Sequence, residues 1–257
     1  MTTIGGTGTA TRADTVRTWA VLGAAVLQTV AGSLGGSGFL GESQRVLSDR
    51  YPSLLTPATI AFSVWPVIYL ALLLFAVHQS LPGQRSRPVH RATGWLFVAT
   101  AVLNAGWIVV FSQELLGLAQ LMIVALLVVL AVALRRLTAV PADGVVDRLL
   151  VHGPWAFYAG WVSAATVAGL SVTLTYWGAA LGPVPAAALL LVAAAAFGYA
   201  TRLTTAAVPY AATVVWALVW VAAASVAVVT VVAVLGALAV VTVAVLRTRE
   251  GVRAAFG

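Results

Sequence analysis

Long apolar stretches with few charges dominate this sequence. Seven of them cover most of its 257 residues, and the last, residues 208–246, carries no charge and is too long for one membrane crossing. An uncharged apolar run of about 18 residues or more is typical of a transmembrane helix. Helices satisfy their own backbone hydrogen bonds in hydrocarbon, and the runs lack the alternation of barrel strands. The sequence therefore predicts an all-α polytopic membrane helix bundle of about eight transmembrane helices.

The turn near Ser225 decides the number of spans. With it, the last apolar stretch divides into two helices; without it, seven spans remain and the C-terminus changes sides. The first span is longer than the apolar part of a typical signal peptide, so we expect a retained helix. The eight spans are expected at residues 16–38, 59–80, 92–111, 115–134, 152–174, 184–201, 208–224 and 226–246.

The arginines predict the orientation. All 14 basic residues are arginine, and only Arg45 and Arg50 fall on the side of the membrane opposite the other twelve. Because cytoplasmic segments are enriched in Arg and Lys, both termini are expected in the cytoplasm, with the chain in the cytoplasmic (inner) membrane. The basic charge lies between spans and forms no patch on a soluble face, so nucleic acid is not an expected partner.

Residues with catalytic or metal-binding chemistry are sparse. The chain has no cysteine. His78 lies at the end of the second span, His90 in a loop and His152 at the start of the fifth, so the three histidines are expected to be isolated and to form no metal site. No ionisable residue is expected at mid-depth, which argues against a proton-coupled transporter. No cofactor is required by these patterns, and an enzymatic activity stays uncertain.

Tryptophan is the unusual component. The nine Trp outnumber the eight Phe and the six Tyr. Trp19, Trp95, Trp155 and Trp177 lie near expected helix ends, where an interfacial aromatic belt explains them. Five others, at positions 65, 107, 161, 216 and 220, fall inside spans, where they serve either core packing or a binding site.

Helical spacing gathers several of these residues onto shared faces. Residues 62, 65 and 69 share one helix face, residues 104, 107 and 111 share a second, and residue 161 lies on a third. These three faces are expected to converge on an aromatic pocket of the kind that suits a large, flat, apolar ligand. The alternatives are interhelical hydrogen bonding for Asn104 and close helix packing for Ser163. The long loop at residues 39–58 acts either as a lid over this pocket or as a plain connector. The candidate ligand-binding residues are Phe62, Trp65, Tyr69, Asn104, Trp107, Phe111, Trp161 and Ser163.

Three motifs resemble those of the TspO/MBR family, the tryptophan-rich sensory proteins related to the mitochondrial translocator protein. Residues 62–69 (FSVWPVIY) are similar to the family's F-x-x-x-W-x-x-x-Y, one residue shorter before Trp. Residues 103–107 (LNAGW), followed by Phe111, resemble its L-N-x-x-W, and residues 161–166 (WVSAAT) resemble its W-V-S-F-A-T. The family's proline-rich loop motif is reduced to residues 55–58 (LTPA), which puts one loop contact to ligand in doubt.

The resemblance implies a five-helix core, residues 16–176, with a pocket for porphyrin, haem or another hydrophobic ligand beneath the first long loop. Its lining would include Trp65, Tyr69, Asn104, Trp107 and Trp161. Residues 177–247 would be a three-helix extension of a long, divergent form, and residues 1–15 and 248–257 would be cytoplasmic tails.

The expected function is that of a membrane binding or sensory protein, a receptor for a tetrapyrrole or similar molecule. A transporter is the alternative, favoured by the extra helices but opposed by the lack of buried charge and of inverted repeats. An enzyme that degrades porphyrin ranks last, because no general base or metal site is evident. Membrane lipid and a hydrophobic small molecule are the expected partners, and a homodimer stays open.

Overall fold

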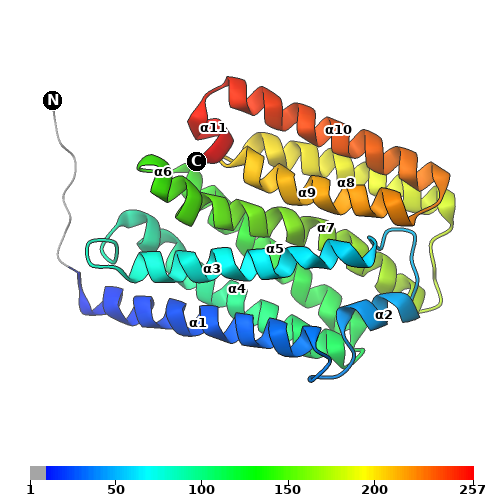
Figure 1. Ribbon diagram of the computed structural model, residues 1–257, viewed down its shortest axis with the longest axis horizontal. Coiled ribbons are helices and arrows are strands. Elements are labelled where there is room, and N and C mark those ends of the chain that lie inside the picture. Colours follow the sequence, from blue (N-terminus) through cyan, green and yellow to red (C-terminus); the bar gives the residue numbers. More distant parts are fainter. Residues whose placement is uncertain (1–9) are drawn as a thin grey trace.

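The computed structural model describes residues 10–257, and within that range every regular element is a helix (Figure 1). Residues 1–9 of the expected N-terminal tail lie outside the described range. Eight helices in the described residues are long and apolar enough to span a membrane. They are α1 (Arg12–Gly36), α3 (Val64–Ser80, entered through the 3₁₀ turn Thr59–Ser63), α4 (Pro88–Ser112), α5 (Leu116–Thr138), α7 (Gly153–Tyr176), α8 (Pro183–Leu203), α9 (Ala207–Ala224) and α10 (Ala227–Arg249). The chain is a multi-pass membrane protein, as predicted.

Three short helices lie outside or before the spans. Helix α2 (Gln44–Arg50) forms within the long loop between α1 and α3. Helix α6 (Gly144–Asp147) runs through a π turn, Arg148–His152, directly into α7. The fifth span therefore begins earlier than residue 152. Helix α11 (Val252–Phe256) follows α10 at the C-terminus.

Local sequence signals set the helix boundaries. Thr11 caps α1, because its hydroxyl accepts a hydrogen bond from the Asp14 backbone N–H at 3.2 Å while the Asp14 carboxylate accepts from the Thr11 N–H. Pro88 and Pro183 stand in the first turns of α4 and α8, where a missing N–H costs nothing. Ser225 separates α9 from α10 in extended conformation. The turn predicted near this residue is confirmed.

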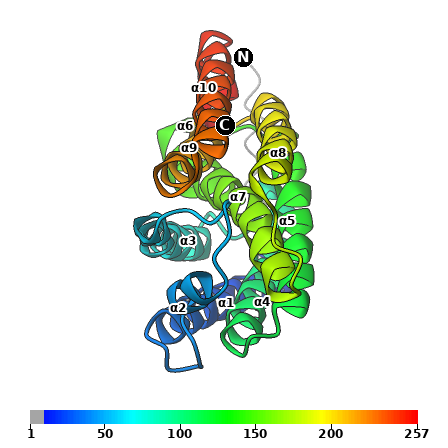
Figure 2. The same ribbon diagram turned by 90° about the vertical axis from the view of Figure 1, so that its right-hand side faces the viewer.

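Helix α7 runs through the middle of the molecule (Figure 2). It packs against α3 and α5 on one side and against α9 and α8 on the other, and α10 packs on both α8 and α9. The approach of α9 is close, because a Cβ at Gly160 would collide with the Tyr210 carbonyl oxygen and the Thr213 hydroxyl. Small residues permit such contact between membrane helices. The C-terminal helices are therefore packed tightly onto the first five.

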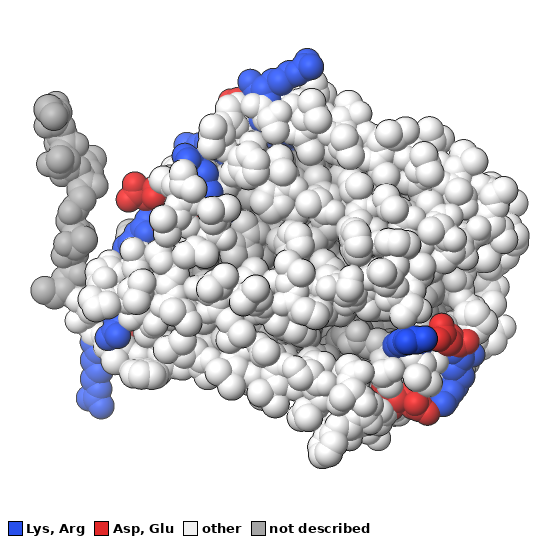
Figure 3. Space-filling model, viewed as in Figure 1, with Lys and Arg blue, Asp and Glu red and all other residues white. Residues whose placement is uncertain are grey.

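Charged side chains gather at the two ends of the bundle (Figure 3). Most arginines lie at the end where α1 begins, which we call the arginine-rich end, and a smaller mixed cluster lies at the opposite end beside α2. At the arginine-rich end, Asp147 pairs with both guanidinium nitrogens of Arg87, with Nη1 to Oδ1 at 2.7 Å. Asp14 binds Arg17 and Arg91 there.

The expectation that His90 lies in a loop and that the three histidines are isolated was wrong. His90 lies in the first turn of α4 and is fully buried, because the helix starts at Pro88, about one turn before the apolar run. Its ring centroid lies 5.9 Å from that of His78 on α3. Two of the three histidines are therefore neighbours.

Candidate functional site

An aromatic cluster lies where α3, α4 and α7 meet. The buried Trp65 ring is at its centre: it stacks on Tyr69 with centroids 5.4 Å apart and contacts Trp107 at 6.1 Å and Trp161 at 6.0 Å. Phe62 meets Trp161 edge-on at 6.2 Å. These distances are those of favourable ring pairs. The three predicted faces do converge.

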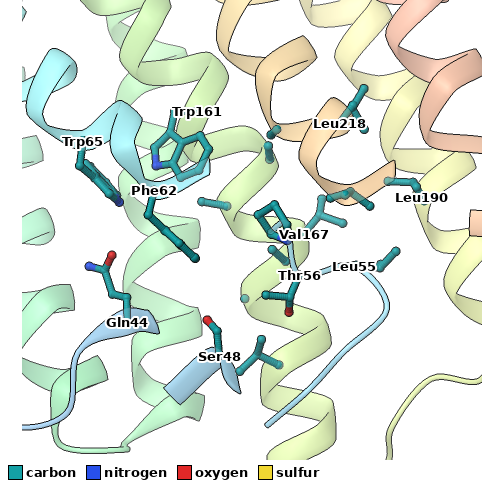
Figure 4. Close-up of a pocket in the computed structure, with 18 of the residues that line it drawn as sticks. Gln44, Ser48, Leu55, Thr56, Phe62, Trp65, Trp161, Val167, Leu190 and Leu218 are labelled. Atoms are coloured by element: carbon teal, nitrogen blue, oxygen red, sulfur yellow. The ribbon is translucent and has the colours of Figure 1, made fainter. Parts of the chain in front are cut away.

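A cavity opens beside this cluster (Figure 4). Aromatic rings form one side of it, and aliphatic residues of α7, α8 and α9 form the other. Polar side chains of α2 and the following loop stand at the mouth. The lining residues are Gln44, Ser48, Leu55, Thr56, Pro57, Phe62, Trp65, Trp107, Phe111, Trp161, Ala164, Ala165, Val167, Ala168, Gly169, Val172, Leu190, Phe197, Ala217, Leu218 and Val221.

Several hydrogen-bond donors of the cluster have no acceptor among the described residues. They are the indole N–H groups of Trp65 and Trp161 and the amide nitrogen of Asn104. The Asn104 oxygen, in contrast, accepts from the Tyr69 hydroxyl at 3.3 Å. Buried polar groups normally have partners. The site can therefore donate hydrogen bonds to a ligand that carries acceptors on an otherwise apolar body.

The long loop between α1 and α3 covers the mouth of this cavity. Gln44 and Ser48 of α2 and the stretch Leu55–Pro57 all line it. Of the two expectations for this loop, the position over the cavity favours a lid. Residues 55–57 belong to the segment in which the resemblance left a ligand contact in doubt, and they lie at the site.

One anchor of the loop is the turn between α4 and α5. Glu114 forms an ion pair with Arg50 and accepts a hydrogen bond from the Tyr51 hydroxyl at 2.8 Å. The Glu114 carboxylate raises the pKa of Tyr51, because it favours the protonated phenol. The Arg50 guanidinium also contacts Glu42 at 2.5 Å. These ties hold α2 at the end of the bundle.

Helix α9 supplies the second anchor. The indole N–H of Trp216 donates to the Ala61 carbonyl at 3.0 Å, and the Ala58 N–H donates to the Trp220 carbonyl at 3.0 Å. The Ser225 hydroxyl donates to the Leu54 carbonyl at 2.8 Å. We call these three bonds the α9 clamp. They fasten residues 54–61 to the C-terminal helices.

The structure brings most of the predicted site residues to one place. Phe62, Trp65, Trp107, Phe111 and Trp161 all line the cavity. Tyr69 and Asn104 form a hydrogen-bonded pair behind the Trp65 ring.

Ser163 is placed differently. It lies on the α9 side of α7, where its hydroxyl accepts from Tyr210 at 2.9 Å and donates to the Ala159 carbonyl at 2.8 Å. This position agrees with the alternative of close helix packing for Ser163, and Ser163 does not line the cavity.

The aliphatic wall from the C-terminal helices was not anticipated. Leu190 and Phe197 of α8 and Ala217, Leu218 and Val221 of α9 line the cavity. Nothing in their sequence separates them from residues that face lipid, since both environments are apolar. The one sequence feature that pointed to a role for α9 at the site was the position of Trp216 and Trp220 inside a span.

A second opening lies between α1 and α3. This groove is lined by Gly32, Gly36, Pro66 and Leu70 among others. Phe62, Trp65 and Gln44 line both the groove and the cavity. Gly32 faces the Tyr69 ring so closely that a Cβ would collide with it. Two aromatic side chains thus separate the cavity from the groove.

The family follows from comparison with known proteins. The family model described as TSPO-like protein matches residues 15–246, a range that includes the C-terminal helices as well as the first five. No curated protein and no solved structure is significantly similar to the chain. A polytopic helix bundle with a buried aromatic cluster accords with that match. The chain belongs to the TSPO-like family.

Proposed function

We propose that this protein is a membrane binding or sensory protein whose cavity takes a flat, hydrophobic ligand of the tetrapyrrole type, such as a porphyrin or haem. The observation that carries the proposal is a set of N–H donors that have no acceptor among residues 10–257. The indole N–H groups of Trp65 and Trp161 belong to residues that line the apolar cavity, and the Asn104 amide lies behind the Trp65 ring. A ring with peripheral carboxylates matches both features, because its faces are apolar and its edge accepts hydrogen bonds.

The aromatic end is packed closely, so binding requires movement. The ring centroids of Phe62 and Trp161 lie 6.2 Å apart, and the Phe62 side chain is only half-buried. We expect Phe62 to swing toward the groove between α1 and α3 and admit the ring. The lid then closes over the ligand through Gln44 and Ser48 at the mouth.

The test is a titration of the detergent-purified protein with protoporphyrin IX, followed by the porphyrin Soret band so that the readout does not depend on tryptophan. We expect saturable micromolar binding. Trp107→Ala should weaken it about tenfold or more, since buried aromatic contacts dominate such sites. Asn104→Ala should weaken it by a similar factor, because it removes an unpaired amide N–H. Trp95→Ala is the matched control, because Trp95 lies on α4 as well but is 55% exposed. Equal effects of Trp107→Ala and Trp95→Ala would contradict the proposal.

Transport of the same ligand is the second candidate. It is favoured by the shared wall of Phe62 and Trp65, because only this wall separates the cavity from the open groove between α1 and α3. Vesicles loaded with protoporphyrin IX separate the two functions. Protein-dependent efflux supports the transporter, whereas saturable binding without efflux supports the receptor.

We also propose the cytoplasmic membrane as the location, with the arginine-rich end inside. Twelve of the 14 arginines support this orientation. Because eight spans return the chain to its starting side, both termini then lie in the cytoplasm.

A further inference from the structure

The cavity has two chemically distinct halves. Its aromatic half is formed by Phe62, Trp65, Trp107, Phe111 and Trp161. Its other half is formed by small and aliphatic side chains of α7 and of the C-terminal helices. Figure 4 shows Trp65, Phe62 and Trp161 on one side, Leu218 and Leu190 on the other, and Gln44 and Ser48 at the mouth.

Helix α7 runs along both halves. Trp161 stands at the aromatic end, and Ala164, Ala168 and Val172 follow at intervals that keep them on adjoining parts of one face. At 1.5 Å per residue, the wall from Trp161 to Val172 is roughly 16 Å long. Ala164, Ala168 and Val172 all line the cavity. The aliphatic half thus follows this face of α7, and we call it the channel.

The C-terminal helices complete this channel. Ala217, Leu218 and Val221 of α9 and Leu190 of α8 face α7 across it. The described polar side chains of the lining, Gln44, Ser48 and Thr56, all belong to α2 and the lid. A molecule that fills the channel therefore has a purely hydrocarbon part there, while its polar atoms stay near the mouth and the aromatic donors.

We propose that the ligand of this site is a flat ring that carries a long aliphatic tail, with the ring among the tryptophans and the tail in the channel between α7 and α9. The inference rests on the proposed function for the ring and extends it to the ligand's second part. It also gives the C-terminal helices a role, because they form the side of the channel that faces α7.

The test compares two iron porphyrins that differ in one substituent, haem b and haem O, of which only the second carries a farnesyl-derived tail. Binding of each to the intact protein in the same detergent is measured by the Soret band. The filling variant is Ala217→Leu, and Ala212→Leu is the matched control, because Ala212 lies on α9 as well but is exposed on its outer side. Comparing variants cancels the partition of each probe into detergent.

We expect Ala217→Leu to weaken haem O binding about tenfold or more, because each methylene kept out of an apolar site lowers a binding constant about fourfold. Haem b has no tail in the channel, so its binding should weaken much less than that of haem O, and Ala212→Leu should affect neither probe. Ala168→Leu fills the same channel from α7 and gives an independent variant if Ala217→Leu does not fold.

The outcomes separate this inference from the proposed function. If the filling variants change both haems equally or neither, while Trp107→Ala weakens both, the tail channel is refuted and the ring site stands. If Trp107→Ala changes neither haem, the ring site itself is refuted. Loss of haem O binding alone in the filling variants supports the tail channel.

Discussion

Replacement of Trp216 by Phe tests whether α9 holds the lid. The substitution removes the indole N–H that donates to the Ala61 carbonyl at 3.0 Å and keeps an aromatic ring at the position. A hydrogen bond of this kind contributes about 0.5–1.5 kcal/mol net. Since 1.4 kcal/mol is a factor of ten, opening of residues 54–61 should become about 2- to 12-fold more frequent.

Trp220→Phe is the matched control. Trp220 lies one turn further along α9, and its ring packs edge-on against Trp216 at 5.4 Å. Its indole N–H has no acceptor among the described residues, and its link to the lid is a backbone carbonyl that receives the Ala58 N–H. The same ring exchange therefore leaves the clamp intact.

Hydrogen–deuterium exchange of the peptide that covers the lid, measured by mass spectrometry in lipid nanodiscs, gives the readout. We expect faster exchange at and around Ala58 in Trp216→Phe and none of this increase in Trp220→Phe. Adding Ser225→Ala, which removes the 2.8 Å bond to the Leu54 carbonyl, should accelerate exchange by a further factor of similar size. Equal acceleration in both Phe variants, or none in either, would refute the clamp.

Three further predictions concern packing, charge and orientation. Gly160→Ala should lower stability by about 1–3 kcal/mol, seen as a lower Tm, because its Cβ meets the backbone of α9, whereas Gly198→Ala, with open space around it, should not. Asp147→Asn should destabilise the protein by about 3 kcal/mol, because it removes the buried carboxylate paired with Arg87 and leaves only the exposed Asp143 at 4.0 Å. Asp143→Asn should be nearly neutral, since the Asp143 side chain is 91% exposed; thermal unfolding of both variants in one detergent compares them. Reporters fused in turn to each terminus should both be active only in the cytoplasm, and a C-terminal reporter active outside would contradict the orientation.

The transmembrane architecture was readable from the sequence because hydrophobic length is a local property. Each span needs only its own run of apolar residues, and Ser225 broke the last run as expected. The aromatic site was partly readable for the same reason, since Phe62, Trp65 and Tyr69 share a helix face by spacing alone. Spacing does not determine which helix faces contact one another, and the structure shows these contacts.

Other features depend on contacts between distant segments. The bond from Trp216 to Ala61 joins residues 155 positions apart, so no local pattern announces it. The aliphatic wall at Ala217 and Leu218 has the composition of a lipid-facing surface and carries no separate signal. His90 was misplaced because the start of α4 is set by Pro88, and hydropathy alone does not detect a helix turn built from polar residues.

The close seat of α9 on α7 bears on how copies of the chain can associate. In the plane of a bilayer, a glycine with its neighbouring small residues is a favoured place for another helix to dock. At Gly160 that place is already taken by Tyr210 and Thr213 of the same polypeptide. The C-terminal helices thus behave as a covalently tethered neighbour, supplied in fixed one-to-one ratio whatever the protein's abundance in the membrane. Any second copy must dock elsewhere, on a surface that α9 leaves uncovered.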